Sequence, residues 1–467
     1  MGVAELTLER TPSWALALGR RAWIPVAILL LALLAYYLSA SYLISPTDIK
    51  RRPPPERYQH HLFLADAILH GTLDVNEVGF PGAEHDTITE GDSKYVPFPP
   101  GPTLLMLPFV AVLGTDFVKD ITGVGPLHGL GEDASQGYGS QIYFSFFIGA
   151  VNVVLFWYLL GLLKISNWTK TLLVPFFAFG TVEFFTATTG TAWHYAHTSA
   201  VFFLLLAIIS MLRRAPPFVP AIFLGLAFLS REPTALAAPF FAYWYFRQNH
   251  ESLRDLLKWR ALLDRKLLLQ LGQFAAGMLP FVLFWFWYNT TRFGSPLDTG
   301  YDILYENLYK PQNLYSFYRR LVPPETKHFG QFDPRNIPLH LYTLFLFPPD
   351  YRPDWSVFRP NAYGLSVLIT SPAFVYACFV RRKDALVPAC WIAIALISVP
   401  LFLHYSQGWV QFGYRFLLDF APFLLILTAF GFDDHTSRQA RGLQVGLVAV
   451  ALMAGFWGRY WASAFGW

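Results

Sequence analysis

QIYFSFFIGAVNVVLFWYLLGLL, residues 141–163, is an apolar run without a single charged side chain. A run of this kind crosses a hydrocarbon core of about 30 Å when it holds roughly 20 residues. Inside that core each backbone N–H and C=O group needs a partner within its own segment, so the run is predicted to be a helix. The apolar residues are continuous rather than alternating, which excludes a transmembrane barrel.

The composition extends this prediction to the rest of the chain. Of its 467 residues, 54% are hydrophobic, 18% are aromatic and 14% are charged, whereas soluble proteins carry roughly 25% charged residues. Most of the surface therefore faces something other than water. The net charge of +4 is small, and we expect no nucleic-acid partner. Cys378 and Cys390 lie in predicted spans and give neither a metal-binding spacing nor a disulfide framework.

Similar apolar runs recur along the sequence and predict about eleven spans. The run 103–113 is too short to cross and is predicted to be interfacial or re-entrant. The first run follows Arg20 and Arg21 but is longer than the core of a signal peptide and ends without a cleavage site, so we interpret it as an uncleaved span. The predicted spans are 23–44, 141–163, 170–187, 196–212, 217–230, 233–247, 267–288, 362–380, 385–403, 416–432 and 442–459.

Basic residues orient these spans, because cytoplasmic loops carry an excess of Lys and Arg. Placing the N-terminus in the cytoplasm puts five later basic clusters on that same side. Treating 103–113 as a full span would move all five outside. The clusters are Lys164 with Lys170, Arg213 with Arg214, the stretch from Arg247 to Lys266, Arg381 to Lys383, and Arg438 with Arg441.

The opposite, extracytoplasmic face receives two long loops, 45–140 and 289–361, which are rich in Pro and aromatic residues. Loops of this length are functional or disordered as a rule, and the aromatic content argues against disorder. We therefore predict an all-α polytopic membrane protein, residues 1–467 forming one transmembrane domain, with its chemistry on the outer face. It is expected in a bacterial plasma membrane, in contact with membrane lipids.

The first outer loop contains a helical pattern from Arg57 to His70, closed by Gly71. Its apolar residues fall on one face, which predicts a helix lying in the membrane interface, with His60, His61 and Asp66 on its other faces. Glu56 precedes this helix, where a carboxylate is favoured by the helix dipole. It is either a cap or a catalytic acid.

Several further polar residues are predicted on the outer face, each with a plain structural alternative. Lys94 precedes a proline-rich turn and could meet a lipid phosphate or simply reach the headgroups. His194 and His197 share one helical face; they could bind a sugar or phosphate, or be structural. Arg231 and Glu232 interrupt an apolar hairpin, and ionisable groups at membrane depth are functional candidates with an expected partner nearby.

Two more arginines complete the predicted site. Arg415 and Asp419 are four residues apart, so they can pair with each other, and Arg292 follows a span on the outer side. A cluster of Arg231, Arg292, Arg415 and Lys94 around carboxylates would suit an anionic substrate that carries phosphate.

At these residues the sequence resembles the GT-C membrane glycosyltransferases, of the protein mannosyltransferase and aminoarabinose transferase type. The resemblance implies transfer of a sugar from a polyprenyl-phosphate donor, outside the cytoplasm, to a glycan, lipid or protein acceptor. It also implies eleven to thirteen helices with two interfacial helices in the first outer loop. The matching segments are 64–67 through 71–74, 94–100, 227–233, 292–296 and 408–416.

The family places an acidic residue after the first span as general base or metal ligand, commonly within an Asp-Glu pair. This chain has a lone Glu56 followed by Arg57, with Asp48 upstream. The expected catalytic residues are therefore Glu56 first and Asp48 second. No cofactor is indicated, and a divalent metal stays open. The expected substrate-binding residues are Lys94, Tyr95, His194, His197, Arg231, Glu232, Arg292, Gln411, Arg415 and Asp419.

Two other interpretations stay open at this point. A transporter or lipid flippase would use similar outer charges, but it should show repeated halves with broken helices. A non-catalytic member of the same fold would lack the usual acidic pair, as this chain does.

Overall fold

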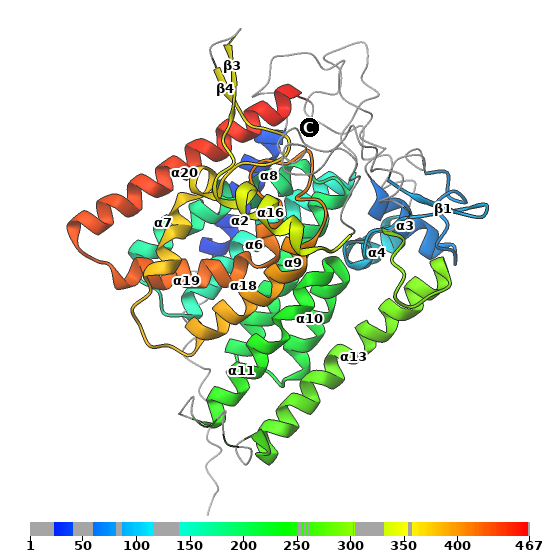
Figure 1. Cartoon of the computed structure of the whole chain (residues 1–467), viewed down its shortest axis with the longest axis horizontal. Coiled ribbons are helices and arrows are strands. Elements are labelled where there is room, and N and C mark those ends of the chain that lie inside the picture. Colours follow the sequence, from blue (N-terminus) through cyan, green and yellow to red (C-terminus); the bar gives the residue numbers. More distant parts are fainter. Residues whose placement is uncertain are drawn as a thin grey trace, which may run out of the picture.

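A computed structural model describes residues 23–40, 59–80, 86–114, 140–250, 262–301, 331–353 and 357–465, together with 255, 258 and 303. The described chain is a bundle of helices (Figure 1). Five of its apolar helices have the length and composition to cross a membrane. They are α6 (Ser140–Leu162), α9 (Ala192–Leu212), α13 (Arg265–Phe293), α18 (Leu386–Leu403) and α20 (Arg438–Phe465).

Shorter helices fill the spaces between these five. They are α2 (Trp23–Ala40), α3 (His60–Leu69), α4 (Gly101–Leu113), α7 (Asn167–Phe179), α8 (Val182–Thr189), α10 (Phe218–Ser230), α11 (Ala238–Asn249), α16 (Ile337–Phe345), α17 (Val367–Thr370) and α19 (Ala421–Asp434). Together α7 and α8 make a sixth candidate span, bent by 43°. The prediction of a helical membrane protein is thus confirmed in part: five or six candidate spans are found, and the count of about eleven stays a prediction.

Four predicted spans are not continuous α-helices. The segment 170–187 is divided into α7 and α8 at Gly180 and Thr181. The other three contain 3₁₀ turns, namely η5 (Glu232–Ala237) in 233–247, η10 (Pro372–Phe379) in 362–380, and η11 (Arg415–Asp419) at the start of 416–432. Pro233 lies in η5 and Pro372 in η10, and because proline lacks an N–H donor it cannot continue the preceding helix.

The expected helix in the first outer loop is present as α3, and Gly71 ends it with a φ of +79°. Its orientation differs from the prediction, because the polar residues His60, His61 and Asp66 are buried whereas Leu69 is 43% exposed. The His61 ring reaches the Thr103 hydroxyl oxygen at 3.0 Å. Hence α3 packs onto α4, the helix expected to be interfacial or re-entrant, through His61 and through the apolar Leu62 and Ala65.

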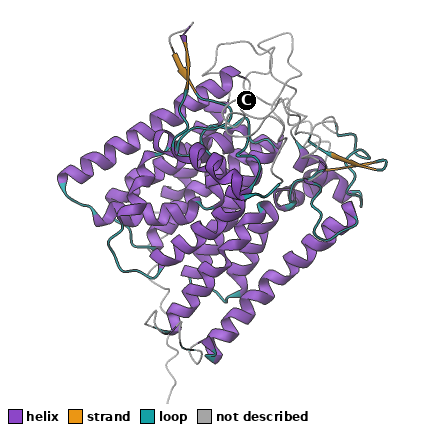
Figure 2. Cartoon of the chain, in the orientation of Figure 1, coloured by secondary structure: helices purple, strands orange, loops and turns teal. Residues whose placement is uncertain are grey.

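Strands contribute only two small hairpins to the described residues (Figure 2). β1 (Ile88–Glu90) pairs antiparallel with β2 (Ser93–Tyr95), and β3 (Asp350–Arg352) pairs antiparallel with β4 (Val357–Arg359). The first hairpin lies in the predicted outer loop 45–140 and the second in the predicted outer loop 289–361. The bounds of these two loops stay predictions. One 3₁₀ turn, η8 (Pro334–Asn336), precedes α16.

Helix α9 lies in the middle of the bundle and packs against α6, α10, α4 and η11. Its long apolar side chains are buried in the main hydrophobic cluster, as Leu204, Leu205 and Ile208 show with no exposed surface. The exposed apolar residues instead follow the peripheral helices α13 and α20, which flank the bundle in Figure 1. In a membrane protein such faces meet lipid.

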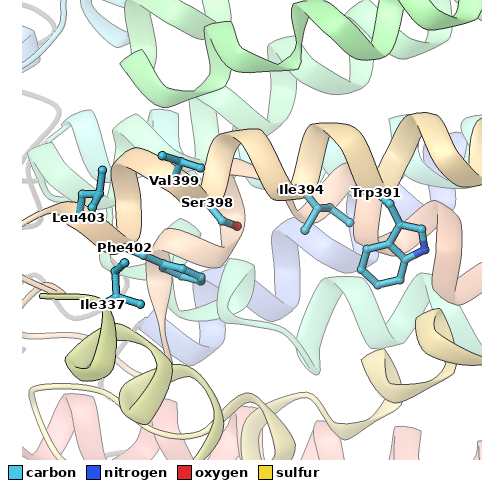
Figure 3. Close-up of a pocket in the computed structure, with 8 residues that line it drawn as sticks. Ile337, Trp391, Ile394, Ser398, Val399, Phe402 and Leu403 are labelled. Atoms are coloured by element: carbon cyan, nitrogen blue, oxygen red, sulfur yellow. The ribbon is translucent and has the colours of Figure 1, made fainter. Parts of the chain in front are cut away.

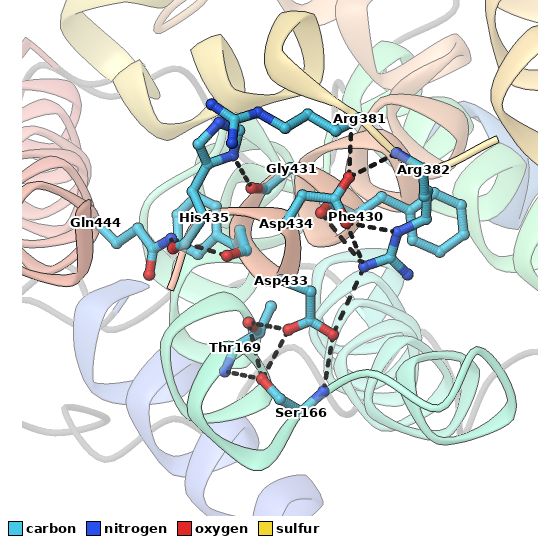
Figure 4. Close-up of polar contacts among 11 residues, drawn as sticks. Ser166, Thr169, Arg381, Arg382, Phe430, Gly431, Asp433, Asp434, His435 and Gln444 are labelled. Carbon is cyan, nitrogen blue, oxygen red and sulfur yellow. Dashed lines mark hydrogen bonds and ion pairs between the residues drawn. The ribbon is translucent and has the colours of Figure 1, made fainter. Parts of the chain in front are cut away.

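Three of the turns predicted to be cytoplasmic meet at one end of the bundle (Figure 4). Asp433 accepts hydrogen bonds from the Ser166 and Thr169 hydroxyls at 2.6 and 2.5 Å. Asp434 accepts from the backbone N–H groups of Arg381 and Arg382 at 2.7 and 3.0 Å. The turns that carry Lys164, Arg381–Lys383 and Arg438 are therefore on the same side, as the basic clusters require.

Replacing Gly455 in α20 should destabilise the bundle, because an added Cβ would collide with the Phe179 carbonyl oxygen. Overpacking of this kind costs about 1–3 kcal/mol. Gly446 in the same helix is the matched control, since a Cβ there meets nothing within 4 Å. We expect Gly455→Ala, and not Gly446→Ala, to lower the melting temperature of the protein in detergent. Equal melting temperatures for the two variants would contradict this packing.

The orientation can be tested with single cysteines in a Cys378→Ser background, in which Cys390 stays buried. Ser437 and Trp409 are exposed at opposite predicted faces. A maleimide that cannot cross membranes should label Trp409→Cys in intact spheroplasts, and Ser437→Cys only after permeabilisation. The reverse pattern would show that the charge rule assigns the wrong side.

Candidate functional site

A buried carboxylate, Asp419, holds together three separate parts of the chain. Its Oδ1 lies 2.7 Å from His197 Nδ1. Arg231 donates to the same carboxylate, from Nη2 to Oδ2 at 3.0 Å and from Nε to both oxygens at 3.2 Å. Asp419 has no exposed surface and His197 has 1%, whereas the Arg231 side chain is 19% exposed. The expected partner of Asp419 was Arg415, so the pairing with Arg231 is a correction.

The interruptions of the helices bring these side chains together. Arg231 follows the last residue of α10 in an extended conformation, with φ −147° and ψ 106°, because Pro233 prevents α10 from continuing. Asp419 ends η11, and one residue separates it from the start of α19. His197 lies in the second turn of α9. The site therefore forms where α9, α10 and α19 begin or end.

The Phe416 ring is the centre around which the other polar groups gather. The Arg231 and Arg415 guanidinium carbons lie 5.2 and 5.6 Å from its centroid, within the range of cation–π attraction. The His197 ring lies 5.7 Å away. We use the term Phe416 cluster for this ring and the residues around it. They are Arg231, Arg415, His197 and Asp419, together with His340, Tyr414 and His404.

Three members of the Phe416 cluster, His340, Tyr414 and His404, were not predicted from the sequence. His340 of α16 contacts the Tyr414 hydroxyl through Nδ1 at 2.8 Å and the His404 carbonyl oxygen through Nε2 at 2.7 Å. Burial, with the nearby charges of Arg231 and Arg415, lowers the pKa of His404 to about 4, so that its imidazole is neutral at pH 7. The only sequence signal for His404 is its position directly after an apolar run.

The predicted residues Gln411 and His194 support this cluster from the same end. The Gln411 side chain donates to the Tyr363 and Gln407 carbonyl oxygens at 3.0 and 2.8 Å and accepts from the Arg415 backbone N–H at 3.2 Å. His194 Nδ1 lies 2.6 Å from the Thr191 hydroxyl oxygen. Gln411 therefore fixes the loop before η11 and with it the position of Arg415.

A second group forms around Arg292 at the end of α13. Arg292 donates to the Val96 carbonyl oxygen at 2.6 Å and to Asn289 Oδ1 at 2.8 Å, and lies on the face of the Tyr288 ring. The predicted residues Lys94 and Tyr95 lie in β2 beside this group, where the Tyr95 and Phe293 rings are 6.0 Å apart. The structure thus gives Arg292 a role in holding the β1–β2 segment on α13.

Glu232 connects the two groups. Its Oε1 accepts from Trp285 Nε1 at 2.8 Å. Burial raises the pKa of Glu232, and the Trp285 hydrogen bond and the charges of Arg231 and Arg292 oppose that rise. Glu56 and Asp48, the expected catalytic residues, lie outside the described residues. Within the described part of the chain no group of three or more His, Cys, Asp or Glu side chains could hold a metal ion.

An apolar groove runs along α18 (Figure 3). It has a volume of about 420 Å³, within the range of ligand sites. Its end is formed by Ile337 of α16 with Phe402 and Leu403. His404 follows directly, and the Phe402 and His340 rings are 6.0 Å apart. The remaining lining residues are Trp391, Ile394, Ala395, Ser398 and Val399.

Comparisons with known proteins give structural similarity at low identity. No protein-family model matches the sequence, and no curated protein matches it. A crystal structure of ArnT from Cupriavidus metallidurans bound to undecaprenyl phosphate is 14% identical, with a TM-score of 0.44, over 91% of this chain and 62% of that one.

Two structures of an oligosaccharyltransferase from Archaeoglobus fulgidus are also similar. The apo form is 15% identical, with a TM-score of 0.42, over 95% of this chain and 56% of that one. The complex of AglB with an inhibitory peptide and a dolichol-phosphate is 15% identical, with a TM-score of 0.39, over 96% and 56%. This chain spans less than two thirds of the length of each of these proteins.

Removing the charge of Asp419 should destabilise the protein strongly. Breaking one side of a buried ion pair costs about 3–5 kcal/mol, because the remaining charge is left uncompensated. Asp333 is the matched control, since Arg335 also binds it through Nε and Nη2, at 2.8 and 2.9 Å, but with an Arg side chain that is 62% exposed. An exposed pair is worth at most about 1 kcal/mol.

We therefore expect Asp419→Asn to lower the melting temperature in detergent far more than Asp333→Asn does. Similar melting temperatures for the two variants would show that the Asp419–Arg231 pair is not needed for the fold.

Proposed function

We propose that this protein is an integral membrane glycosyltransferase, which transfers a sugar from a polyprenyl-phosphate donor to an acceptor on the extracytoplasmic side. The observation that carries the proposal is the Phe416 cluster, where Arg231 and Arg415 lie at one aromatic ring beside an apolar groove. The resemblance of the sequence motifs to GT-C enzymes points to the same class of reaction.

The two arginines suit a phosphate leaving group. As the bond between the sugar and the phosphate breaks, negative charge grows on the phosphate oxygens, and guanidinium groups placed in advance stabilise that charge. Arg231 is the more accessible of the two, and its planar group can serve Asp419 on one edge and a phosphate on another. Glu232 next to it would bind sugar hydroxyls as an acceptor.

The groove along α18 suits the hydrocarbon part of the same donor. Its lining is almost entirely apolar, and it ends at Phe402 and Leu403 directly before His404. A lipid whose phosphate lies at Arg231 and Arg415 would place its first isoprene units there. Three other predicted binding residues, Lys94, Tyr95 and Arg292, would then not contact the phosphate. They would act indirectly, by positioning the β1–β2 segment.

The chemical step is an exchange at the anomeric carbon. An acceptor oxygen forms a bond to that carbon, and the bond from the carbon to the phosphate oxygen breaks. The electron pair of the broken bond stays on the polyprenyl phosphate, and the acceptor proton goes to a general base. The sequence proposes Glu56 or Asp48 as this base.

A lipid transporter is the second candidate, and one observation favours it. The bend of 43° between α7 and α8 is a broken span, as transporters use. A transporter built from repeats would show a matching break in its other half, and among the described helices only this pair is bent in this way. A transporter would move labelled lipid without forming a new glycosidic bond, which separates the two functions.

The function is tested by incubating purified protein with radiolabelled polyprenyl-phosphate hexoses and membrane extract as acceptor source. We expect new labelled product with wild type, and a loss of about 10²–10³-fold in turnover for Arg415→Gln, comparable to removing a charge-stabilising donor. Arg335→Gln, an exposed arginine in η8, should keep wild-type turnover. Label that crosses vesicles without entering a product would identify a transporter instead.

A further inference from the structure

His197 has the geometry of a base held by a carboxylate. Its Nδ1 lies 2.7 Å from Asp419 Oδ1. Because an ionised carboxylate only accepts hydrogen bonds, the imidazole proton belongs on Nδ1. This leaves a lone pair on Nε2, the nitrogen that can take up a proton.

The Nε2 atom of His197 is buried, and no described residue makes a hydrogen bond to it. A buried acceptor without a donor is unfavourable in a folded protein, so this atom points to a donor that is supplied by a ligand. A hydroxyl group is such a donor.

The other histidines of the Phe416 cluster differ from His197. Both ring nitrogens of His340 are engaged, with the Tyr414 hydroxyl and the His404 carbonyl oxygen. His404 directs its Nδ1 to the Ser406 carbonyl oxygen. Among the ring nitrogens described in this cluster, His197 combines a carboxylate on one side with an open acceptor on the other. A base held in one tautomer by a carboxylate is the arrangement that activates hydroxyl nucleophiles in many enzymes.

We propose that His197 is the general base of the transfer reaction and that Asp419 is its positioning residue; this inference rests on the proposed glycosyl transfer. His197 Nε2 takes the proton of the acceptor hydroxyl as the acceptor oxygen attacks the anomeric carbon. The carbon–phosphate oxygen bond breaks, and its electron pair leaves with the polyprenyl phosphate. The imidazolium then releases its proton to solvent after the product departs.

Arg231 couples this base to the donor. Arg231 binds the same carboxylate, Asp419, as His197 does. Its positive charge partly offsets the electrostatic stabilisation that Asp419 gives to a protonated His197. A donor phosphate that binds Arg231 neutralises this charge. His197 therefore becomes a stronger base when the donor is in place, which ties proton removal to a loaded site.

The test uses two substitutions in the full-length protein and the labelled-donor assay. His197→Asn keeps an N–H that can reach Asp419 but lacks the Nε2 atom, and so should preserve the fold. We expect it to lower kcat by about 10²–10⁴-fold, the usual contribution of a general base, with little change in KM for the donor. His435→Asn is the matched control outside the Phe416 cluster, because His435 lies at the other end of the bundle with its Nδ1 2.9 Å from the Gly431 carbonyl oxygen. It should lower kcat by less than about 10-fold.

Four outcomes decide the inference. A melting temperature near that of wild type, together with the loss of kcat in His197→Asn, supports the base. If His197→Asn unfolds, the same assay is run on His197→Gly with added imidazole. Turnover that imidazole restores supports His197 as the base, and a lack of restored turnover overturns it. Full turnover in His197→Asn, with a loss in Glu56→Gln or Asp48→Asn, transfers the role to those carboxylates and leaves the glycosyltransferase intact. No product from wild type overturns both proposals.

Discussion

The pairing of Asp419 with Arg231 is the constraint on which the end of the bundle predicted to face outward depends. Taking two charges out of water costs several kcal/mol per ion, and their attraction offsets this cost only when the geometry is good. Here Arg231 donates three hydrogen bonds of 3.0–3.2 Å to the Asp419 carboxylate, and His197 lies 2.7 Å from it. In the 3₁₀ turn η11 residues three apart face the same way, so Phe416 and Asp419 meet the same partners.

Breaks in the helices are the second condition for this site. Backbone groups at membrane depth need partners, and irregular backbone is tolerated there only where protein or a polar cavity supplies them. The loop before η11 meets this need through Gln411, which binds two carbonyl oxygens and a backbone N–H. Arg415 adds a bond to the Trp409 carbonyl oxygen at 2.9 Å. The same interruptions that expose backbone groups thus bring in the side chains that could act on a substrate.

The sequence predicts the helical class and the residue types of the site better than their pairing. Apolar runs indicate spans, and Arg231, His197 and Asp419 stand out because ionisable groups are rare among them. Their partners depend on packing between distant segments: His340 meets Tyr414 across 74 positions of sequence. Arg292 seemed equal to Arg231 in sequence, yet it donates to Val96 and Asn289. Periodicity also cannot distinguish an α-helix from the 3₁₀ turns at Pro233 and Pro372.

Carboxylates at the two ends of the bundle show what is specific to the end that holds Asp419. Asp433 and Asp434 bind hydroxyls, backbone N–H groups and the part-exposed Arg382. These contacts connect turns at the surface of the bundle. Asp419 instead binds a guanidinium and an imidazole, and has no exposed surface. Apolar side chains of similar volume would hold helices together as well as such a buried pair, or better. Packing alone therefore does not account for Arg231, His197 and Asp419, and their charge fits the phosphate-bearing substrate that we propose for the Phe416 cluster.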